Sequence, residues 1–163
     1  MSEVLLLLGS NKGDRLNYLN LALDRIDRIS LQTPVVSHIF ESEPWGFDSN
    51  TWFLNMAVSI QTDLPPLELL DKLMEIESDL GRKRDPESVG YNSREIDIDI
   101  ILFGEYIVDE ERLKIPHPRA HLRKFVLEPL ADIVPDYYFP GFGKSVKELL
   151  KSCPDNSDVL LWP

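Results

Sequence analysis

The sequence has a single cysteine, no long hydrophobic run and few basic residues. Because Cys153 is the only cysteine, the chain cannot form an intrachain disulfide or assemble a cysteine-based zinc site. A lone thiol is typical of a reducing compartment. The apolar stretch from Val4 to Leu8 is too short for a signal peptide or a membrane span, and no basic region precedes it. We therefore expect a cytoplasmic protein with no membrane partner.

The shortage of basic residues limits the possible partners. There are 17 Lys and Arg against 28 Asp and Glu, and the net charge of −11 argues against a nucleic-acid partner. Many of the basic residues nevertheless lie close together in the sequence: Arg82, Lys83, Arg84, Arg94, Arg112, Lys114, Arg119, Arg123 and Lys124. Such a cluster in an acidic protein suits a small polyanion such as a nucleotide, and scattered solvated charges are the alternative.

Hydrophobic periodicity predicts alternating strands and helices. Strands are expected over 3–8, 35–40, 53–60 and 95–103. Asp14 can cap a first helix, and Pro65-Pro66 opens a second that ends at Gly81. The inward face of the first helix is predicted to be Leu16, Leu19, Leu23, Ile26 and Ile29. That of the second is predicted to be Leu67, Leu70, Leu73 and Leu80.

The last third of the chain contains shorter elements. Gly104-Glu105 is interpreted as a hairpin turn from the strand at 95–103 into 106–108, and helical pieces are expected over 119–133. Ser145 and Glu148 have the spacing of a capping box that opens a final helix. No repeat or linker interrupts the 163 residues. The element order predicts one α+β domain over 1–163, with a ferredoxin-like sheet, helices packed on it and C-terminal additions.

Asp97 and Asp99 give the strongest chemical signal. Side chains alternate along a strand, so these carboxylates share one face while Ile96, Ile98 and Ile100 share the other. Two adjacent carboxylates repel, and a magnesium ion, which prefers oxygen ligands, relieves that repulsion. For an isolated pair of this kind, a solvated acidic face is the alternative interpretation.

Arginines near this pair favour the chemical interpretation. Arg82 and Arg84 precede the strand, and Arg94 lies at its entrance, where guanidinium groups suit phosphoryl oxygens. Carboxylate-held magnesium with several arginines is what phosphoryl transfer requires, since catalysis there is mainly positioning and charge neutralisation.

Three further segments are ambiguous taken singly. Gly143-Lys144-Ser145 ends like a phosphate-binding loop, but Tyr138 stands where that motif needs glycine, so a helix-opening turn is the better interpretation. Gly9-Ser10-Asn11 lacks the other glycines of a dinucleotide fingerprint and indicates only a turn. His117, between two prolines, is equally consistent with a phosphate contact and with a structural or exposed histidine.

Taken in order, however, four segments of the chain form a specific pattern. They are Gly9-Ser10-Asn11; Phe53-Leu54-Asn55-Met56-Ala57-Val58; Arg94-Glu95-Ile96-Asp97-Ile98-Asp99-Ile100 with Leu102-Phe103-Gly104; and Ile115-Pro116-His117-Pro118-Arg119. Together they closely resemble the 6-hydroxymethyl-7,8-dihydropterin pyrophosphokinase family, from Val4 to about Leu150. The resemblance implies a ferredoxin-like fold, two magnesium ions, and ATP that gives its terminal diphosphate to a pterin with release of AMP.

The resemblance also implies roles for individual residues. Asp97 and Asp99 correspond to the metal ligands, and with Arg84 and Arg94 they form the expected catalytic group. ATP is expected to contact Glu77, Arg84, Arg94, Ile100, Arg112, Lys114, His117 and Arg123. The pterin is expected to contact Ser42, Trp45, Phe53, Asn55 and Phe125, with the two phenylalanines on its faces. Without the resemblance, core packing is the alternative for Phe53 and Phe125.

The sequence thus favours an enzyme of folate biosynthesis that acts on small molecules as a monomer. Two rivals remain from the residues alone. A nucleotidyltransferase would also use paired carboxylates on such a sheet, but it would release pyrophosphate. A non-catalytic nucleotide-binding domain would need neither both carboxylates nor an aromatic pair beside them.

Overall fold

The computed structural model describes residues 1–44, 51–81 and 95–163. Its main sheet is antiparallel at every pairing and has the strand order β5-β1-β4-β3-β8, with β2 also paired to β4. The strands are β1 (Ser2–Ser10), β2 (Val35–Val36), β3 (Phe40–Ser42), β4 (Phe53–Thr62), β5 (Asp97–Phe103) and β8 (Val159–Leu161). With one helix after β1 and another after β4, this is a ferredoxin-like α+β arrangement, as the sequence predicted.

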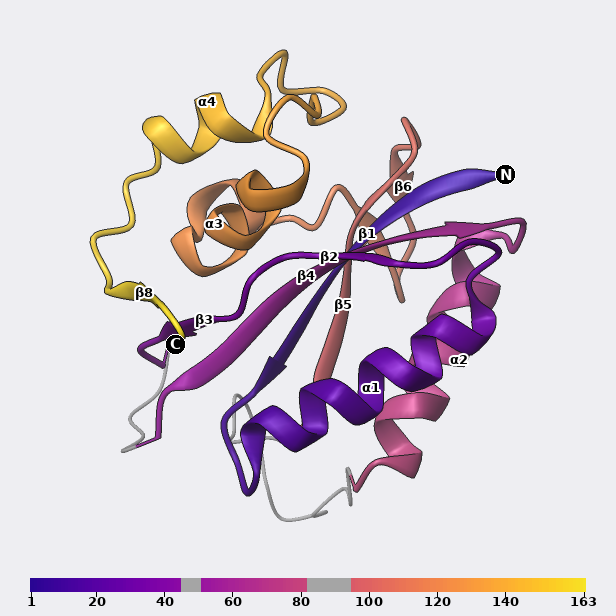
Figure 1. The fold of residues 1–163 in the computed structure, drawn as a ribbon. Helices are drawn as coiled ribbons and strands as arrows, with labels where there is room; N and C mark the ends of the chain where they lie inside the picture. Colours follow the sequence, from indigo (N-terminus) through magenta and orange to yellow (C-terminus); the bar gives the residue numbers. More distant parts are fainter. Residues whose placement is uncertain (45–50, 82–94) are drawn as a thin grey trace.

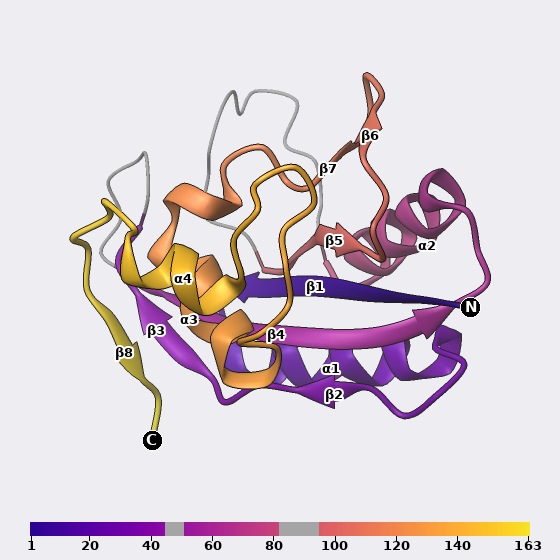
Figure 2. The same ribbon diagram turned by 90° about the horizontal axis from the view of Figure 1, so that it is seen from above.

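Helices cover both faces of this sheet. Figure 1 shows α1 (Arg15–Ile29) and α2 (Pro66–Asp79) on one face, and α3 (Lys124–Ile133) and α4 (Val146–Lys151) on the other. The C-terminal β8 lies beside β3, at the opposite end of the sheet from β5 (Figure 2). A short 3₁₀ helix, η1 (Ala120–Leu122), precedes α3, and β6 (Val108–Asp109) pairs with β7 (Lys114–Ile115) in a separate two-stranded sheet. α3, α4 and β8 are the C-terminal additions.

The alternation of β1 divides the interior into two cores. Leu6 and Leu8 pack with α1 and α2, whereas Leu5 and Leu7 pack with α3 and α4. A strand buried on both faces must be apolar at consecutive positions, which explains the uninterrupted leucine run. At the end of the strand the same alternation puts Gly9 on the α3 face and Ser10 on the α1 face.

Several predicted helix signals are confirmed. The Asp14 side chain accepts a hydrogen bond from the Asn17 amide at 3.1 Å and caps α1. Gly81 follows α2 with φ of +116°, a conformation that favours glycine. Ser145 and Glu148 form a complete capping box at α4. Gly143-Lys144-Ser145 is therefore part of a helix-opening turn.

Other expectations about local structure are wrong. Leu16 and Leu67 are 40% and 36% exposed, because both lie off the buried faces of their helices. The buried positions are Leu19, Ala22 and Ile26 in α1 and Leu69, Leu73 and Ile76 in α2. The strand expected over 35–40 is broken into β2 and β3. The predicted strand at 3–8 continues through Gly9 to Ser10, so Gly9 is a strand residue and the turn starts later.

The turn at Gly104 does not form the expected hairpin. Gly104 has φ of +52°, and the Tyr106 amide donates to the Phe103 carbonyl at 3.0 Å. The following strand, β6, pairs with β7 instead of returning along β5. Within the three described ranges, no helix has both the length and the apolarity required to cross a bilayer.

Candidate active site

Asp97 and Asp99 project from the α3 face of the sheet, as their alternation predicted. In the β5–β1 register Asp97 pairs with Gly9 and Asp99 with Leu7, whose side chain belongs to the α3 core. Asp97 is half-buried and Asp99 is exposed. β5 ends the described sheet, and the partial exposure of Asp97 and the exposure of Asp99 leave both carboxylates within reach of a ligand from solvent.

A row of paired residues connects this acidic edge to the middle of the sheet. Gly9 pairs with Asp97 on one side and with Asn55 on the other, and Asn55 pairs in turn with Phe40. Directly paired residues in an antiparallel sheet point to the same face, and so does Phe53, two residues before Asn55. The carboxylate of Asp97 and the amide of Asn55 are thus separated by a residue without a side chain.

Gly9 keeps the space between these groups open. A Cβ atom at Gly9 would lie 3.1 Å from Asn55 Oδ1 and 3.5 Å from Phe53 Cδ1. The first distance is shorter than ordinary van der Waals contact, so a side chain here would crowd the Asn55 amide. The glycine backbone conformation is not left-handed, so glycine is needed here for space.

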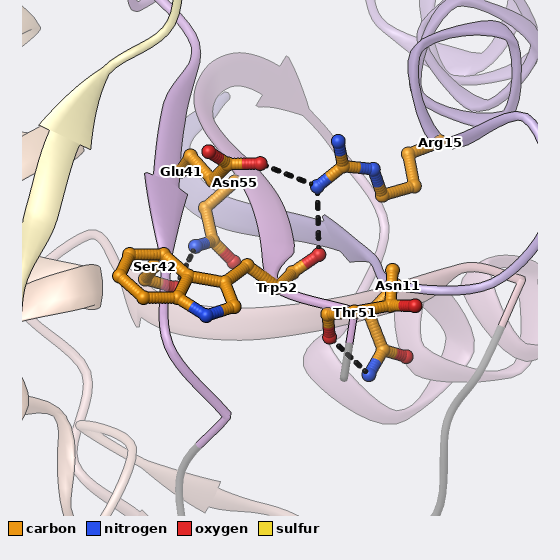
Figure 3. Close-up of polar contacts among 7 residues, drawn as sticks. All are labelled: Asn11, Arg15, Glu41, Ser42, Thr51, Trp52 and Asn55. Atoms are coloured by element: carbon orange, nitrogen blue, oxygen red, sulfur yellow. Dashed lines mark hydrogen bonds and ion pairs between the residues drawn. The ribbon is translucent and has the colours of Figure 1, made fainter. Parts of the chain in front are cut away.

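The amide of Asn55 is held in one orientation. Its Nδ2 donates a hydrogen bond to the Ser42 hydroxyl at 2.6 Å, and both residues are buried (Figure 3). That bond directs Oδ1 toward the space above Gly9. The site therefore presents a fixed hydrogen-bond acceptor beside the ring of Phe53, an arrangement that suits a flat polar heterocycle with N–H donors.

Phe53 and Phe125 are both half-buried; Phe53 belongs to the sheet and Phe125 to the helical layer that covers it. Phe53 starts β4, whereas Phe125 lies in the first turn of α3 and packs partly against the α3–α4 core. The Arg123 guanidinium carbon lies 5.7 Å from the centre of the Phe125 ring. This cation–π contact joins a predicted ATP residue to a predicted pterin residue.

His117 is tied to the edge strand and is neutral at physiological pH. Its amide donates to the Ile101 carbonyl at 2.9 Å, and its Nδ1 accepts from the Arg119 amide at 3.3 Å. Burial, with smaller contributions from the positive charges of Arg123 and Arg119, lowers the pKa of His117 to about 4. Because Nδ1 accepts, the proton of the neutral ring is on Nε2, which is then a donor.

Four other residues expected to contact ATP are more dispersed: Glu77, Ile100, Arg112 and Lys114. Glu77 is buried in α2, and its Oε2 accepts a hydrogen bond from the Ile98 amide at 2.9 Å, which secures the outer edge of β5. The Ile100 side chain is buried in the α1–α2 core, on the face opposite Asp97. Arg112 pairs with Asp71 of α2, and Lys114 pairs with Asp109 of β6; all four of these partners are exposed.

Three predicted site residues, Trp45, Arg84 and Arg94, lie outside the described residues. The other predicted residues fall into two groups. Asp97, Asp99, Asn55, Phe53 and Ser42 share one face at one end of the sheet. The residues expected to bind nucleotide are distributed around the β5 edge and the start of α3.

The side chains at this edge of the sheet can supply what a magnesium ion requires. In the part of the chain that the structure describes, no group of three or more His, Cys, Asp or Glu side chains is arranged to hold a metal. Asp97 and Asp99 offer oxygen ligands on one accessible face. Magnesium usually takes one or two carboxylates and completes its shell with water and substrate phosphates, so the residues present fit it.

Gly9 lies within the candidate site, although the sequence motif around it indicates only a turn. A glycine inside a strand often marks a close approach of a ligand or of another backbone, and this signal was available in the sequence. What the sequence could not supply was the register that puts Gly9 between Asp97 and Asn55.

Comparison with known proteins decides the family. Residues 5–135 match the family model for 7,8-dihydro-6-hydroxymethylpterin-pyrophosphokinase (HPPK). The chain belongs to the HPPK family. The resemblance identified from the sequence motifs is thereby confirmed.

Two curated HPPK relatives have similar lengths. The 2-amino-4-hydroxy-6-hydroxymethyldihydropteridine pyrophosphokinase of Bacillus subtilis is 44% identical over 156 residues, which cover 95% of this chain and 87% of that protein. The Aquifex aeolicus protein of the same name is 38% identical over 148 residues, covering 91% of this chain and 90% of that protein.

A solved structure shares the fold. The crystal structure of wild-type Plasmodium falciparum HPPK-DHPS superposes with a TM-score of 0.72 at 15% identity, over 93% of this chain. This chain spans 44% of that longer protein. At this identity the similarity establishes the fold alone.

Proposed function

We propose that this HPPK family member transfers a diphosphate from Mg-ATP to the hydroxymethyl group of 6-hydroxymethyl-7,8-dihydropterin in folate biosynthesis. The products are the pterin diphosphate and AMP. The observation that carries the proposal is the row Asp97–Gly9–Asn55, in which a carboxylate suited to magnesium and a fixed amide acceptor flank a residue without a side chain. A substrate that joins a polar ring to a phosphate-accepting hydroxyl fits that order.

The pterin end consists of Asn55, Ser42, Phe53 and Phe125, with Trp45 assisting through its main chain. Asn55 Oδ1 accepts from an N–H group of the pterin, and the Ser42 hydroxyl keeps the amide in that orientation. The two aromatic rings bind the faces of the pterin, since a flat heterocycle gains most from contact with aromatic faces. The exocyclic hydroxymethyl group then extends across Gly9 toward Asp97.

The phosphate end depends on carboxylates and basic groups. Asp97 and Asp99 would hold two magnesium ions, which neutralise charge on the phosphates and lower the pKa of the attacking hydroxyl. His117 donates from Nε2 to the triphosphate, and the buried Arg123 contributes positive charge beside it. Arg84 and Arg94 are proposed to steady the transferred diphosphate and the leaving AMP.

The adenosine is proposed to bind along the outer edge of β5. Glu77 accepts from the Ile98 amide there, and Arg112 and Lys114 lie on the neighbouring segments. Because the Ile100 side chain is buried in the α1–α2 core, its contact with the nucleotide uses the backbone. An edge strand offers backbone donors and acceptors for such binding.

The reaction is proposed to be a direct in-line displacement. The hydroxymethyl oxygen attacks the β-phosphorus of ATP, and the bond from that phosphorus to the oxygen bridging it to the α-phosphate breaks. AMP departs with that oxygen, and the hydroxyl proton passes to Asp99 or to water. Catalysis is then chiefly alignment of the two substrates and neutralisation of phosphate charge.

We further propose that residues 1–163 act as one pyrophosphokinase domain, as a monomer in the cytoplasm. Size-exclusion chromatography with light scattering tests the oligomeric state.

Phosphorus NMR of the purified protein with Mg-ATP and 6-hydroxymethyl-7,8-dihydropterin tests the activity. The expected products are AMP and a pterin diphosphate, both absent for Asp97→Ala. Pyrophosphate release would indicate a nucleotidyltransferase, and ATP binding without turnover would indicate a regulatory nucleotide-binding domain. Either of those results would contradict the proposal.

A further inference from the structure

Arg15, the first residue of α1, connects three segments on the α1 face of the sheet. One of its terminal nitrogens, Nη1, donates both to Glu41 Oε2 at 2.7 Å and to the Trp52 carbonyl at 2.8 Å (Figure 3). Its guanidinium carbon lies 5.2 Å from the centre of the Trp162 ring. One side chain thus joins α1 to β3, to the residue before β4, and to the C-terminal segment.

A second side chain from the same turn reinforces this connection. Asn11 Nδ2 donates to the Thr51 carbonyl at 3.5 Å (Figure 3). Two consecutive carbonyls, those of Thr51 and Trp52, are therefore held by Asn11, which follows β1, and by Arg15, which begins α1. These carbonyls immediately precede Phe53, so their position determines where β4 begins and how the Phe53 ring is presented.

The residues held by Arg15 lie directly behind the proposed pterin site. Glu41 pairs with Leu54, whose side chain belongs to the α1–α2 core. Their strand neighbours Ser42 and Phe53 pair with each other and point to the opposite face. Arg15 therefore fixes the separation of β3 and β4 from the α1 side of the sheet. At the same positions along these strands, Ser42 and Phe53 point to the α3 side, where the pterin is proposed to bind.

The ion pair is shielded enough to fix this geometry. The Arg15 and Glu41 side chains are only 20% and 26% exposed. Charge-assisted hydrogen bonds in such a site are shorter and stronger than neutral ones, and a lost partner leaves a poorly solvated charge. Arg15, Glu41, Thr51, Trp52 and Leu160 line a surface hollow of about 390 Å³, so a shorter side chain leaves no sealed cavity.

We propose that Arg15 is a positioning residue for the pterin: through Glu41 and the Trp52 carbonyl, it holds Ser42 and Phe53 in the geometry that binds the ring. This inference rests on the proposed function, which supplies the pterin as ligand. Arg15 then affects the affinity for the pterin, and it takes no part in the phosphoryl transfer at Asp97.

The test compares Arg15→Met with a matched control on the same helix. Arg25 also pairs across to another element, with Asp79 of α2 at 2.8 Å, but it is remote from the pterin residues. In Arg15→Met the KM for the pterin should rise about tenfold, because a small displacement of positioning groups weakens productive binding. The kcat and the KM for ATP should stay within about twofold of the wild type, and Arg25→Met should change none of these constants.

Two conservative variants keep the test decisive if Arg15→Met folds poorly. Arg15→Lys retains a charge and several donors on a shorter chain, so it should recover part of the pterin affinity. Glu41→Gln retains the Trp52 bond and should weaken pterin binding less than Arg15→Met. An unchanged pterin KM in all three Arg15 and Glu41 variants, or an equal rise in Arg25→Met, overturns the proposal.

A binding measurement separates this inference from the proposed function. Absence of turnover by the wild-type protein refutes the proposed function. Pterin affinity, measured by quenching of tryptophan fluorescence in wild type and Arg15→Met, then tests the inference alone. Tighter wild-type binding supports a positioning role, and equal affinities overturn it.

Discussion

Asp97 and Gly9 are direct cross-strand partners, and Asn55 flanks Gly9 on the other side. The register of three strands thus creates a gap one residue wide between a carboxylate and an amide. Strand spacing is about 4.8 Å, so the backbones that carry the two polar groups stand roughly 10 Å apart. That span is suited to a hydroxymethyl-pterin whose ring meets Asn55 while its hydroxyl lies toward Asp97.

Replacement of Gly9 by alanine should weaken pterin binding. The new methyl group would lie 3.1 Å from Asn55 Oδ1 and 3.5 Å from the Phe53 ring, in the space proposed for the substrate. We expect the pterin dissociation constant, measured by calorimetry, to rise at least about tenfold. ATP affinity should change little, and thermal stability should fall only slightly: the Gly9 backbone is acceptable to alanine, and the Asn55 amide must shift to make room for the methyl group. Unchanged pterin affinity would contradict the role given to this gap.

Asp97→Asn and Asp99→Asn should each abolish most turnover without unfolding the protein. Each change removes a carboxylate proposed to hold magnesium, and loss of one such electrostatic contact typically costs about 10²–10³ in kcat. The magnesium concentration that gives half-maximal rate should also increase. Asp24→Asn, at an exposed ion pair on α1, is the matched control and should behave as wild type. Wild-type magnesium dependence in both site variants would refute their assignment.

The His117 ring should titrate abnormally, and ATP should reverse the shift. Burial lowers its pKa to about 4 in the free protein, and a bound triphosphate favours the protonated ring. NMR titration of the ring proton, assigned with His117→Gln, should therefore show a higher pKa in the ATP complex. An identical pKa in both states would mean that His117 does not contact the phosphates.

The same shift makes His117 reduce stability in acid. Between its unfolded value near 6.5 and its folded value of about 4, the unfolded chain binds more protons, so stability falls as pH decreases through this window. Denaturant unfolding at pH 7 and pH 4.5 should show a smaller stability loss for His117→Gln than for wild type. Equal losses would argue against burial of a neutral ring.

Ser42→Ala should lower pterin affinity less than Asn55→Ala does. Without the hydroxyl, Asn55 loses the 2.6 Å hydrogen bond that orients its amide, but it keeps the acceptor itself. A loss of about 1 kcal/mol in binding free energy is expected for Ser42→Ala, and a larger loss for Asn55→Ala. Competition binding with the product pterin diphosphate measures both. The reverse ranking would exclude an orienting role for Ser42.

Ser145→Ala should destabilise the fold and leave catalysis unchanged. Ser145 and Glu148 cap α4, which packs on the face shared with α3 but supplies no proposed substrate contact. Loss of such a cap costs about 1 kcal/mol of unfolding free energy, to be measured by denaturant titration. A change in kcat/KM would indicate that α4 affects the site through α3.

Local sequence signals predicted most of the secondary structure. The leucine run of β1, the Asp14 cap and the Ser145–Glu148 box depend on interactions within a few residues, and these are confirmed. The prediction of a hairpin at Gly104 is wrong because a turn residue specifies a reversal of the chain but not the partner of the next strand. The predicted burial of Leu16 and Leu67 is wrong because apolar character alone does not determine which face of a helix meets the core.

For the candidate site, too, the sequence predicts the features that depend on neighbouring residues and not those that depend on distant ones. Alternation along one strand was enough to put Asp97 and Asp99 on a common face, and motif resemblance supplied candidates on β3, β4 and α3. The contribution of Gly9, and of Arg15 with Glu41, depends on pairings between segments distant in the sequence. No local pattern contains that information.

By itself, therefore, the sequence determined the α+β class, the family and the paired carboxylates, because short-range periodicity and ordered motifs specify each of them. Only the tertiary structure decided that Gly9 separates Asp97 from Asn55, that the Ser42 hydroxyl orients the Asn55 amide, and that Arg15 supports β3 and β4 from behind. The physical reason is register: the alignment of strands is set by the combined packing of both cores, and a shift of one residue would turn every side chain to the other face.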